Sequence, residues 1–162
     1  MLPEDLITRA ARVVQLFTDK KETLALAESC TGGLIAACIT SVTGSSAVLE
    51  RGFVTYSNTS KTEEVFVPAE LIAQHGAVSA EVASAMAVGA RNISKVTVAL
   101  AVTGIAGPSG GSEEKPVGLV YLALATQDNV DVRRFKFDGD RDEVRRQAVV
   151  KALSMLVSVG NE

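Results

Sequence analysis

Apolar residues recur every three or four positions at both ends of the chain, a spacing typical of amphipathic helices. Near the amino terminus the pattern predicts a helix from Pro3 to about Lys20, opened by proline and acidic residues. Its apolar face comprises Leu6, Ile7, Ala10, Val13, Val14 and Phe17. A last helix is predicted after Asp140, which forms a capping box with Glu143. The packed face of that helix comprises Val144, Ala148, Val149, Ala152, Leu153 and Leu156.

Five stretches between these helices have the pattern of β-strands. They are Thr23–Glu28, Val48–Tyr56, Lys95–Thr103, Pro116–Thr126 and Val130–Phe137. The third is almost wholly apolar, as expected of a central strand that is covered on both faces. The connection between the last two strands is so short that they must form an antiparallel hairpin.

Four further helical segments are predicted between the strands. They are Gly33–Ser41, Thr62–Phe66, Pro68–Gln74 and a longer, small-residue-rich helix that is capped by Ser79. Gly76 ends the third of these segments, because glycine readily adopts the conformation that follows a last helical turn. The pattern as a whole predicts an α/β fold with a mixed, mostly parallel sheet that includes a C-terminal antiparallel hairpin.

The composition is that of one soluble globular domain over residues 1–162, with 47% hydrophobic and 22% charged residues. There is no Trp, so we expect an aliphatic, alanine-rich core. The net charge of −3 and the absence of a basic stripe argue against non-specific nucleic-acid binding. No signal-peptide pattern or long apolar run occurs, which predicts a cytoplasmic protein without a membrane partner.

Cysteine and histidine usage is too sparse for a disulfide or a metal site. Cys30 and Cys38 would lie about 12 Å apart along one helix, which is beyond disulfide reach. One His and two Cys form no ligand cluster with recognisable spacing, so no metal is expected. The alanine-rich faces are compatible with a homodimer.

The most informative stretch is Ala25–Gly33, where an apolar run ends in Ser29, Cys30, Thr31 and two glycines before helical spacing resumes. This pattern predicts a strand, a sharp turn and a helix, which would lift Ser29 above the carboxyl end of the sheet. Ser29 is therefore the candidate nucleophile. The alternative is that Ser29 or Thr31 only caps the helix, and this stretch alone leaves both interpretations open.

A second glycine-rich element, Thr103–Ser112, follows the buried central strand. Ligands of open α/β sheets bind at the carboxyl ends of strands, near the point where the strand order reverses. The two glycine-rich loops are therefore predicted to border one crevice.

Candidates for a base are few. His75 is the only histidine, and its position beside a helix-ending glycine favours a role in the helix end over a catalytic triad. Lys61 could activate a serine if burial kept its amine neutral, although a solvated lysine is the commoner case. Tyr56 could hydrogen-bond the serine, the lysine or a substrate, or simply be half-buried packing.

Two other features of the sequence suggest chemistry. Cys30 could itself be a nucleophile, because a helix amino terminus acidifies a thiol. Arg141 and Arg145 lie four positions apart, and Arg141 falls in the first turn of the last helix, where a cation opposes the helix dipole. This placement suggests that they bind an anion, whereas an exposed ion pair with neighbouring acidic residues would contribute little.

Six blocks of the sequence together resemble the CinA C-terminal domain family, also called the PncC family of nicotinamide-nucleotide amidases. The blocks are Ala27–Gly33, Arg51–Asn58 with Lys61, Gln74–Ser79, Thr103–Pro108, Gly111–Gly118 and Gly139–Arg145. The resemblance extends from about Thr23 to Leu156. It implies a three-layer α/β/α sandwich that hydrolyses the carboxamide of nicotinamide mononucleotide to nicotinic acid mononucleotide and ammonia, in pyridine-nucleotide salvage.

The resemblance also implies site roles: Ser29 as nucleophile, Lys61 as general base and Tyr56 as a hydrogen-bonding partner, with no metal or organic cofactor. Backbone N–H groups from Cys30 through Thr31 and Gly32 to Gly33 would hold the oxyanion. Residues expected to bind or orient the nucleotide are Thr103, Gly104, Gly107, Arg141 and Arg145. The phosphate would lie either against the Gly107–Ser112 loop or against the two arginines.

Many CinA proteins carry a larger N-terminal domain, so this chain resembles the stand-alone amidase form. Two alternatives remain. The first is a non-catalytic nucleotide-binding or interaction domain of a competence- or damage-associated protein. The second is an amidase for another carboxamide, such as nicotinamide itself.

Overall fold

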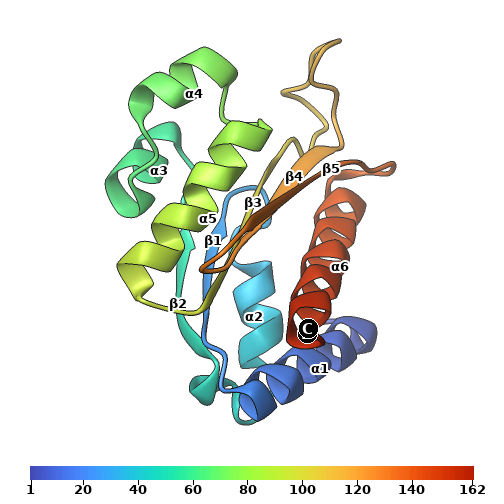
Figure 1. Ribbon diagram of the computed structural model, residues 1–162. Helices are drawn as coiled ribbons and strands as arrows, with labels where there is room; N and C mark the ends of the chain where they lie inside the picture. Colours follow the sequence, from blue (N-terminus) through green and yellow to red (C-terminus); the bar gives the residue numbers. More distant parts are fainter.

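The computed structural model describes residues 1–162 and contains one five-stranded sheet (Figure 1). Its strands are β1 (Leu24–Glu28), β2 (Leu49–Val54), β3 (Val98–Gly104), β4 (Leu119–Ala125) and β5 (Val130–Lys136). The spatial order is β2-β1-β3-β4-β5. β1 pairs in parallel with β2 and β3, whereas β4 pairs antiparallel with β3 and β5. The predicted mixed sheet with a C-terminal hairpin is confirmed.

Helices cover both faces of the sheet (Figure 1). One face carries α1 (Glu4–Lys20), α2 (Leu34–Thr40) and α6 (Arg141–Gly160). The other carries α3 (Asn58–Val65), α4 (Ala69–His75) and α5 (Ala80–Ser94), and a short 3-10 turn, η1 (Ser45–Ala47), precedes β2. The chain is therefore a three-layer α/β/α sandwich. No helix is both long enough and apolar enough to cross a membrane.

Side-chain size differs between the two faces of the sheet. Along β1, Leu24 and Leu26 pack toward α1, α2 and α6, whereas Ala25 and Ala27 pack toward α5. β3 and β4 repeat this alternation, because successive side chains of a strand point to opposite faces. The alanine layer lets α5 lie close against the sheet, as its small residues predicted.

Gly89 of α5 provides a test of this close packing. A Cβ atom at this position would overlap the backbone carbonyl of Val65, the last residue of α3. Helix propensity alone favours Ala over Gly by about 1 kcal/mol, but we expect Gly89→Ala to lower the free energy of unfolding by roughly 1–3 kcal/mol through overpacking. Denaturant titration measures the change. The exposed α5 substitution Asn92→Ala is the control, and an unchanged or raised stability of Gly89→Ala would contradict the expectation.

One predicted boundary is wrong in a way that affects the site. The segment predicted to begin near Thr62 is α3, which begins at Asn58. The Ser57 side chain caps it by accepting a hydrogen bond from the Ser60 N–H. Lys61 therefore projects from a helix and not from a flexible connection.

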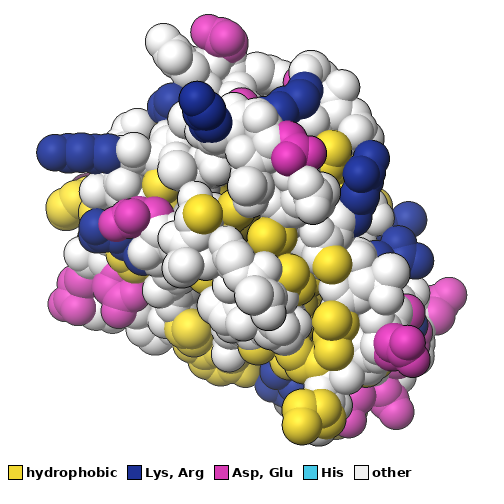
Figure 2. All heavy atoms as spheres, turned by 90° about the horizontal axis from the view of Figure 1, so that it is seen from below, with side chains coloured by type: hydrophobic (Ala, Val, Ile, Leu, Met, Phe, Trp, Pro, Cys, Tyr) yellow, Lys and Arg dark blue, Asp and Glu magenta, His cyan; other side chains and the backbone are white.

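The sheet has its topological switch point between β1 and β3. The chain leaves β1 toward β2 on one side and later returns to β3 on the other side. The carboxyl ends of these strands lie at the upper end of Figure 1. Figure 2 shows the molecule from below, where acidic and basic side chains are interspersed around a hydrophobic patch and form no basic stripe on that face.

Candidate active site

A cavity of about 260 Å³ opens at the carboxyl ends of β1 and β3. Its lining combines both glycine-rich loops with the segment that follows β2 and the start of α6. The lining residues are Ser29, Cys30, Tyr56, Asn58, Lys61, Ala77, Val78, Thr103, Gly104, Ile105, Ala106, Gly107, Ser109, Gly110 and Arg141. The expectation that the two loops border one crevice is confirmed.

Ser29 and Lys61, 32 positions apart in the chain, meet in this cavity. The Lys61 Nζ atom lies 3.1 Å from the Ser29 Oγ atom, which is hydrogen-bonding distance. Only 8% of Ser29 and 1% of Lys61 are exposed to solvent. The turn after β1 presents the hydroxyl, and the first turns of α3 present the amine.

The surroundings of Lys61 favour an uncharged amine. Lys61 forms no ion pair with a carboxylate, and burial lowers the pKa of its amine below the ordinary value of 10.5. The Thr55 carbonyl lies 2.7 Å from Nζ, and two further carbonyls lie at 3.5 Å. A neutral amine can donate two hydrogens to such carbonyls and still accept the hydroxyl proton of Ser29.

The turn that carries Ser29 is held by a residue to which the sequence analysis gave no role. The Glu28 carboxylate accepts hydrogen bonds from the backbone N–H groups of Gly33, Ile35 and Ala36 at the start of α2. No side chain of the turn caps α2 at its N-cap position. The alternative that Ser29 or Thr31 caps this helix is therefore wrong.

These contacts limit which N–H groups can face a ligand. Gly33 donates to Glu28, and Gly32 donates to the Ser29 carbonyl at 3.0 Å. Neither glycine lines the cavity, nor does the fully buried Thr31. The N–H groups of Cys30 and Thr31 donate to no backbone carbonyl. Of the four predicted oxyanion donors, only Cys30 both lines the cavity and has an N–H group without a carbonyl partner.

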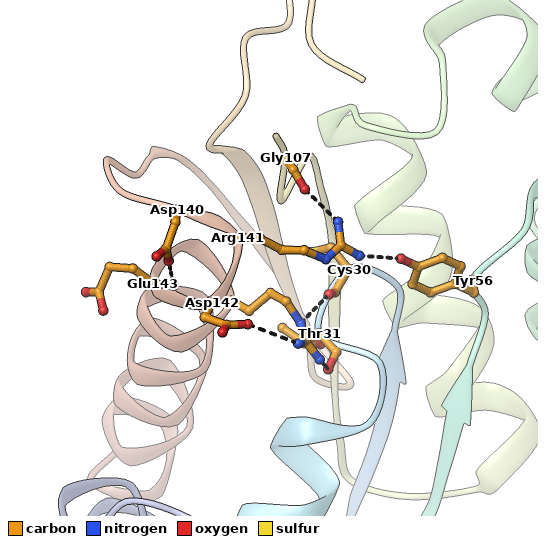
Figure 3. Close-up of polar contacts among 9 residues, drawn as sticks. Cys30, Thr31, Tyr56, Gly107, Asp140, Arg141, Asp142 and Glu143 are labelled. Carbon is orange, nitrogen blue, oxygen red and sulfur yellow. Dashed lines mark hydrogen bonds and ion pairs between the residues drawn. The ribbon is translucent and has the colours of Figure 1, made fainter. Parts of the chain in front are cut away.

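Arg141 closes one side of the cavity (Figure 3). Its Nη2 atom donates to the Tyr56 hydroxyl at 2.9 Å, and its Nη1 atom donates to the Gly107 carbonyl at 2.7 Å. The guanidinium thereby joins the segment after β2 to the second glycine-rich loop. Arg141 forms no ion pair with a carboxylate, so its charge is available to an anionic ligand.

Arg145 lies in a different place from Arg141. Its guanidinium donates to the carbonyls of Cys30 and Thr31, both at 3.2 Å, and it does not line the cavity. It also lies 3.9 Å from the Asp142 carboxylate. The predicted arginine pair is therefore divided: Arg141 faces the cavity and Arg145 supports the turn of Ser29.

Two predicted binding residues lie at the end of β3, where they mainly determine the shape of the cavity wall. The Thr103 hydroxyl donates to the Ala77 carbonyl at 2.9 Å and joins β3 to the loop before α5. Gly104 lines the cavity where a Cβ atom would approach the Leu119 carbonyl to 2.9 Å. A larger residue at position 104 would disturb the β3–β4 pairing.

His75 and Cys30 do not form a rival site. His75 lies outside the cavity lining, and its Nδ1 atom is 3.7 Å from the Glu81 carboxylate. Cys30 lines the cavity, but burial raises the pKa of its thiol to about 12. The expected acidification by the α2 amino terminus is wrong, because burial dominates the environment of this thiol.

Sequence reasoning missed Glu28 and Asn58. Asn58 lines the cavity from the first turn of α3, in a segment predicted to be a connection. Glu28 had a visible signal, since a charged residue ends an otherwise apolar strand immediately before the candidate nucleophile. No group of three or more His, Cys, Asp or Glu side chains is placed to hold a metal ion.

The fold and the cavity define an α/β/α protein with a buried serine–lysine pair at the carboxyl ends of parallel strands. The family model of the CinA C-terminal domain matches residues 7–159, and the chain belongs to this family. A CinA-like protein of Citrifermentans bemidjiense is 61% identical over 145 residues, which cover 90% of this chain and 35% of that protein. The chain thus spans only part of the length of such relatives.

Two further relatives match nearly end to end. The nicotinamide-nucleotide amidohydrolase PncC of Escherichia coli is 49% identical over 157 residues, which cover 96% of this chain and 95% of that protein. The crystal structure of the competence/damage inducible protein CihA from Agrobacterium tumefaciens has a TM-score of 0.95 at 46% identity. That match covers 100% of this chain and 99% of the other.

Proposed function

We propose that this protein hydrolyses the carboxamide of nicotinamide mononucleotide to nicotinic acid mononucleotide and ammonia, a step of pyridine-nucleotide salvage. The observation that carries the proposal is the 3.1 Å contact between the Ser29 hydroxyl and the buried Lys61 amine inside a cavity. The 49% identity to the amidohydrolase PncC, over nearly the whole of both chains, supports the choice of reaction.

In the first step, the neutral Lys61 amine takes the Ser29 proton while the serine oxygen attacks the carboxamide carbon. Negative charge then develops on the carboxamide oxygen. The N–H group of Cys30, a residue that lines the cavity, donates to no backbone carbonyl and is the proposed donor to this oxygen. Losing one such donor typically costs about 100-fold or more in rate.

In the second step, the tetrahedral intermediate expels ammonia, which takes a proton either directly from Lys61 or from Tyr56, which Lys61 then reprotonates. Tyr56 can supply this proton, because its hydroxyl oxygen accepts from Arg141 and leaves its own O–H free to donate. Water then attacks the acyl-enzyme while Lys61 accepts its proton, and Lys61 returns this proton to the Ser29 oxygen as nicotinic acid mononucleotide leaves.

Arg141 and the loop from Gly107 are proposed to hold the phosphate together. The hydrogen bond from Arg141 to the Gly107 carbonyl supports this proposal, because it places the loop and this arginine side by side. Ser109 and Gly110 line the same part of the cavity. Arg145 is assigned no contact with the nucleotide.

The test is ammonia release by the purified protein, measured with nicotinamide mononucleotide and with free nicotinamide. We expect ammonia release from the mononucleotide and not from free nicotinamide, because only the mononucleotide carries an anionic phosphate that Arg141 can bind. Release from nicotinamide at an equal rate would favour an amidase for simple carboxamides. Binding of the mononucleotide without ammonia release would favour a nucleotide-binding domain.

A further inference from the structure

Glu28 is a buried acidic residue that holds the start of a helix beside the proposed nucleophile. It is 1% exposed and ends β1, one position before Ser29. Its carboxylate accepts four hydrogen bonds. The donors are the Thr31 hydroxyl at 2.6 Å, the Gly33 and Ile35 N–H groups at 3.1 Å and the Ala36 N–H group at 2.9 Å.

These contacts join the sheet to α2 across the turn. The backbone of Glu28 is fixed in the sheet, where its carbonyl accepts from the Thr55 N–H at 2.9 Å. Its side chain satisfies N–H groups that have no partner inside the helix. Hydrogen bonds to an ionised group are about twice as strong as those between neutral groups. Ser29 therefore begins a turn whose two ends are joined by one carboxylate.

A second contact supports the same turn from its carbonyl side. Arg145 donates to the Cys30 and Thr31 carbonyls, so the turn lies between a buried carboxylate and a guanidinium. The negative charge of Glu28 also offsets the positive end of the α2 dipole. The amino terminus of α2 is thereby occupied by a residue of the protein itself.

We propose that Glu28 is a positioning residue, whose carboxylate holds the Ser29 oxygen within reach of the Lys61 amine and orients the Cys30 N–H group toward the cavity. This role rests on the proposed function, because it requires Ser29 to be the nucleophile. Glu28 does not line the cavity, so this role involves no contact between Glu28 and the substrate.

The test is Glu28→Gln, which keeps the side-chain size but replaces one acceptor oxygen with an NH2 donor. All four partners of the side chain are donors, so the amide must leave at least one of them unsatisfied. We expect kcat to fall about 100-fold, the loss typical of a misplaced reacting group, with KM nearly unchanged. Glu28→Asp, which keeps the carboxylate, should recover part of this loss.

A second readout separates positioning from a general loss of stability. A fluorophosphonate probe labels an activated serine whatever the natural substrate is, and the labelling rate of Ser29 should fall in Glu28→Gln in parallel with kcat. The control is Thr97→Val, which removes the two hydrogen bonds of the Thr97 hydroxyl with the Thr23 backbone at the opposite end of the sheet. It should lower the thermal midpoint without changing the labelling rate.

The outcomes distinguish the two proposals. A wild type that releases no ammonia but labels faster than Glu28→Gln would overturn the amidase proposal and keep the role of Glu28. Equal labelling rates in wild type and Glu28→Gln, or no labelling of the wild type, would overturn the role of Glu28. If Glu28→Gln does not fold, Thr31→Val removes one of the four donors and is measured in the same way.

Discussion

Ser29→Ala is expected to lower kcat for ammonia release by about 10⁴-fold or more, the loss seen when a nucleophilic serine is removed. The reason is that the adjacent thiol cannot replace the hydroxyl: burial raises the pKa of Cys30 to about 12, so this thiol stays protonated near neutral pH. Steady-state ammonia release measures the change. Ser154→Ala, an exposed substitution on α6, is the matched control and should keep wild-type activity.

A covalent intermediate provides the direct test of this assignment. Wild type quenched during turnover should gain the mass of the substrate less ammonia, attached at Ser29, whereas Ser29→Ala should gain nothing. A fully active Ser29→Ala variant would end the serine mechanism.

Lys61→Met and Lys61→Arg are both expected to lower kcat by about 10²–10⁴-fold, the usual contribution of a general base. The two variants differ in charge. Methionine carries no charge, whereas arginine is a cation that cannot be deprotonated in a protein. Measured ammonia release close to wild type in Lys61→Arg would mean that position 61 supplies charge and does not act as a base.

The pH dependence of both activity and stability follows from the lowered pKa of Lys61. Activity requires the neutral amine, so kcat/KM should rise with pH along a limb centred below 10.5. Since the folded state binds this proton more weakly than the unfolded chain, stability rises with pH between the lowered folded pKa and 10.5. Thermal midpoints of wild type relative to Lys61→Met should therefore increase across that interval. A difference that is constant with pH would contradict this.

The hydrophobic pattern of the sequence was sufficient to predict most of the fold. Whether one face or both faces of an element are buried determines the spacing of its apolar residues. This spacing can be read from a short stretch of sequence, as it is in β1, β3, α1 and α6. The short connection between β4 and β5 required a hairpin. The start of α3 was missed, because the Ser57 cap precedes a stretch with little apolar periodicity.

The sequence by itself also determined the candidate chemical groups: a serine in a glycine-rich turn, one lysine after the second strand and an arginine at the start of the last helix. Only the tertiary structure decided how these groups are arranged. It brings Lys61 to Ser29, places Arg141 and Arg145 on different sides of the turn, and uses Glu28 to occupy the amino terminus of α2. The physical reason is that pKa values and hydrogen-bond partners depend on burial and on contacts between residues that are distant in the chain, which sequence spacing does not encode.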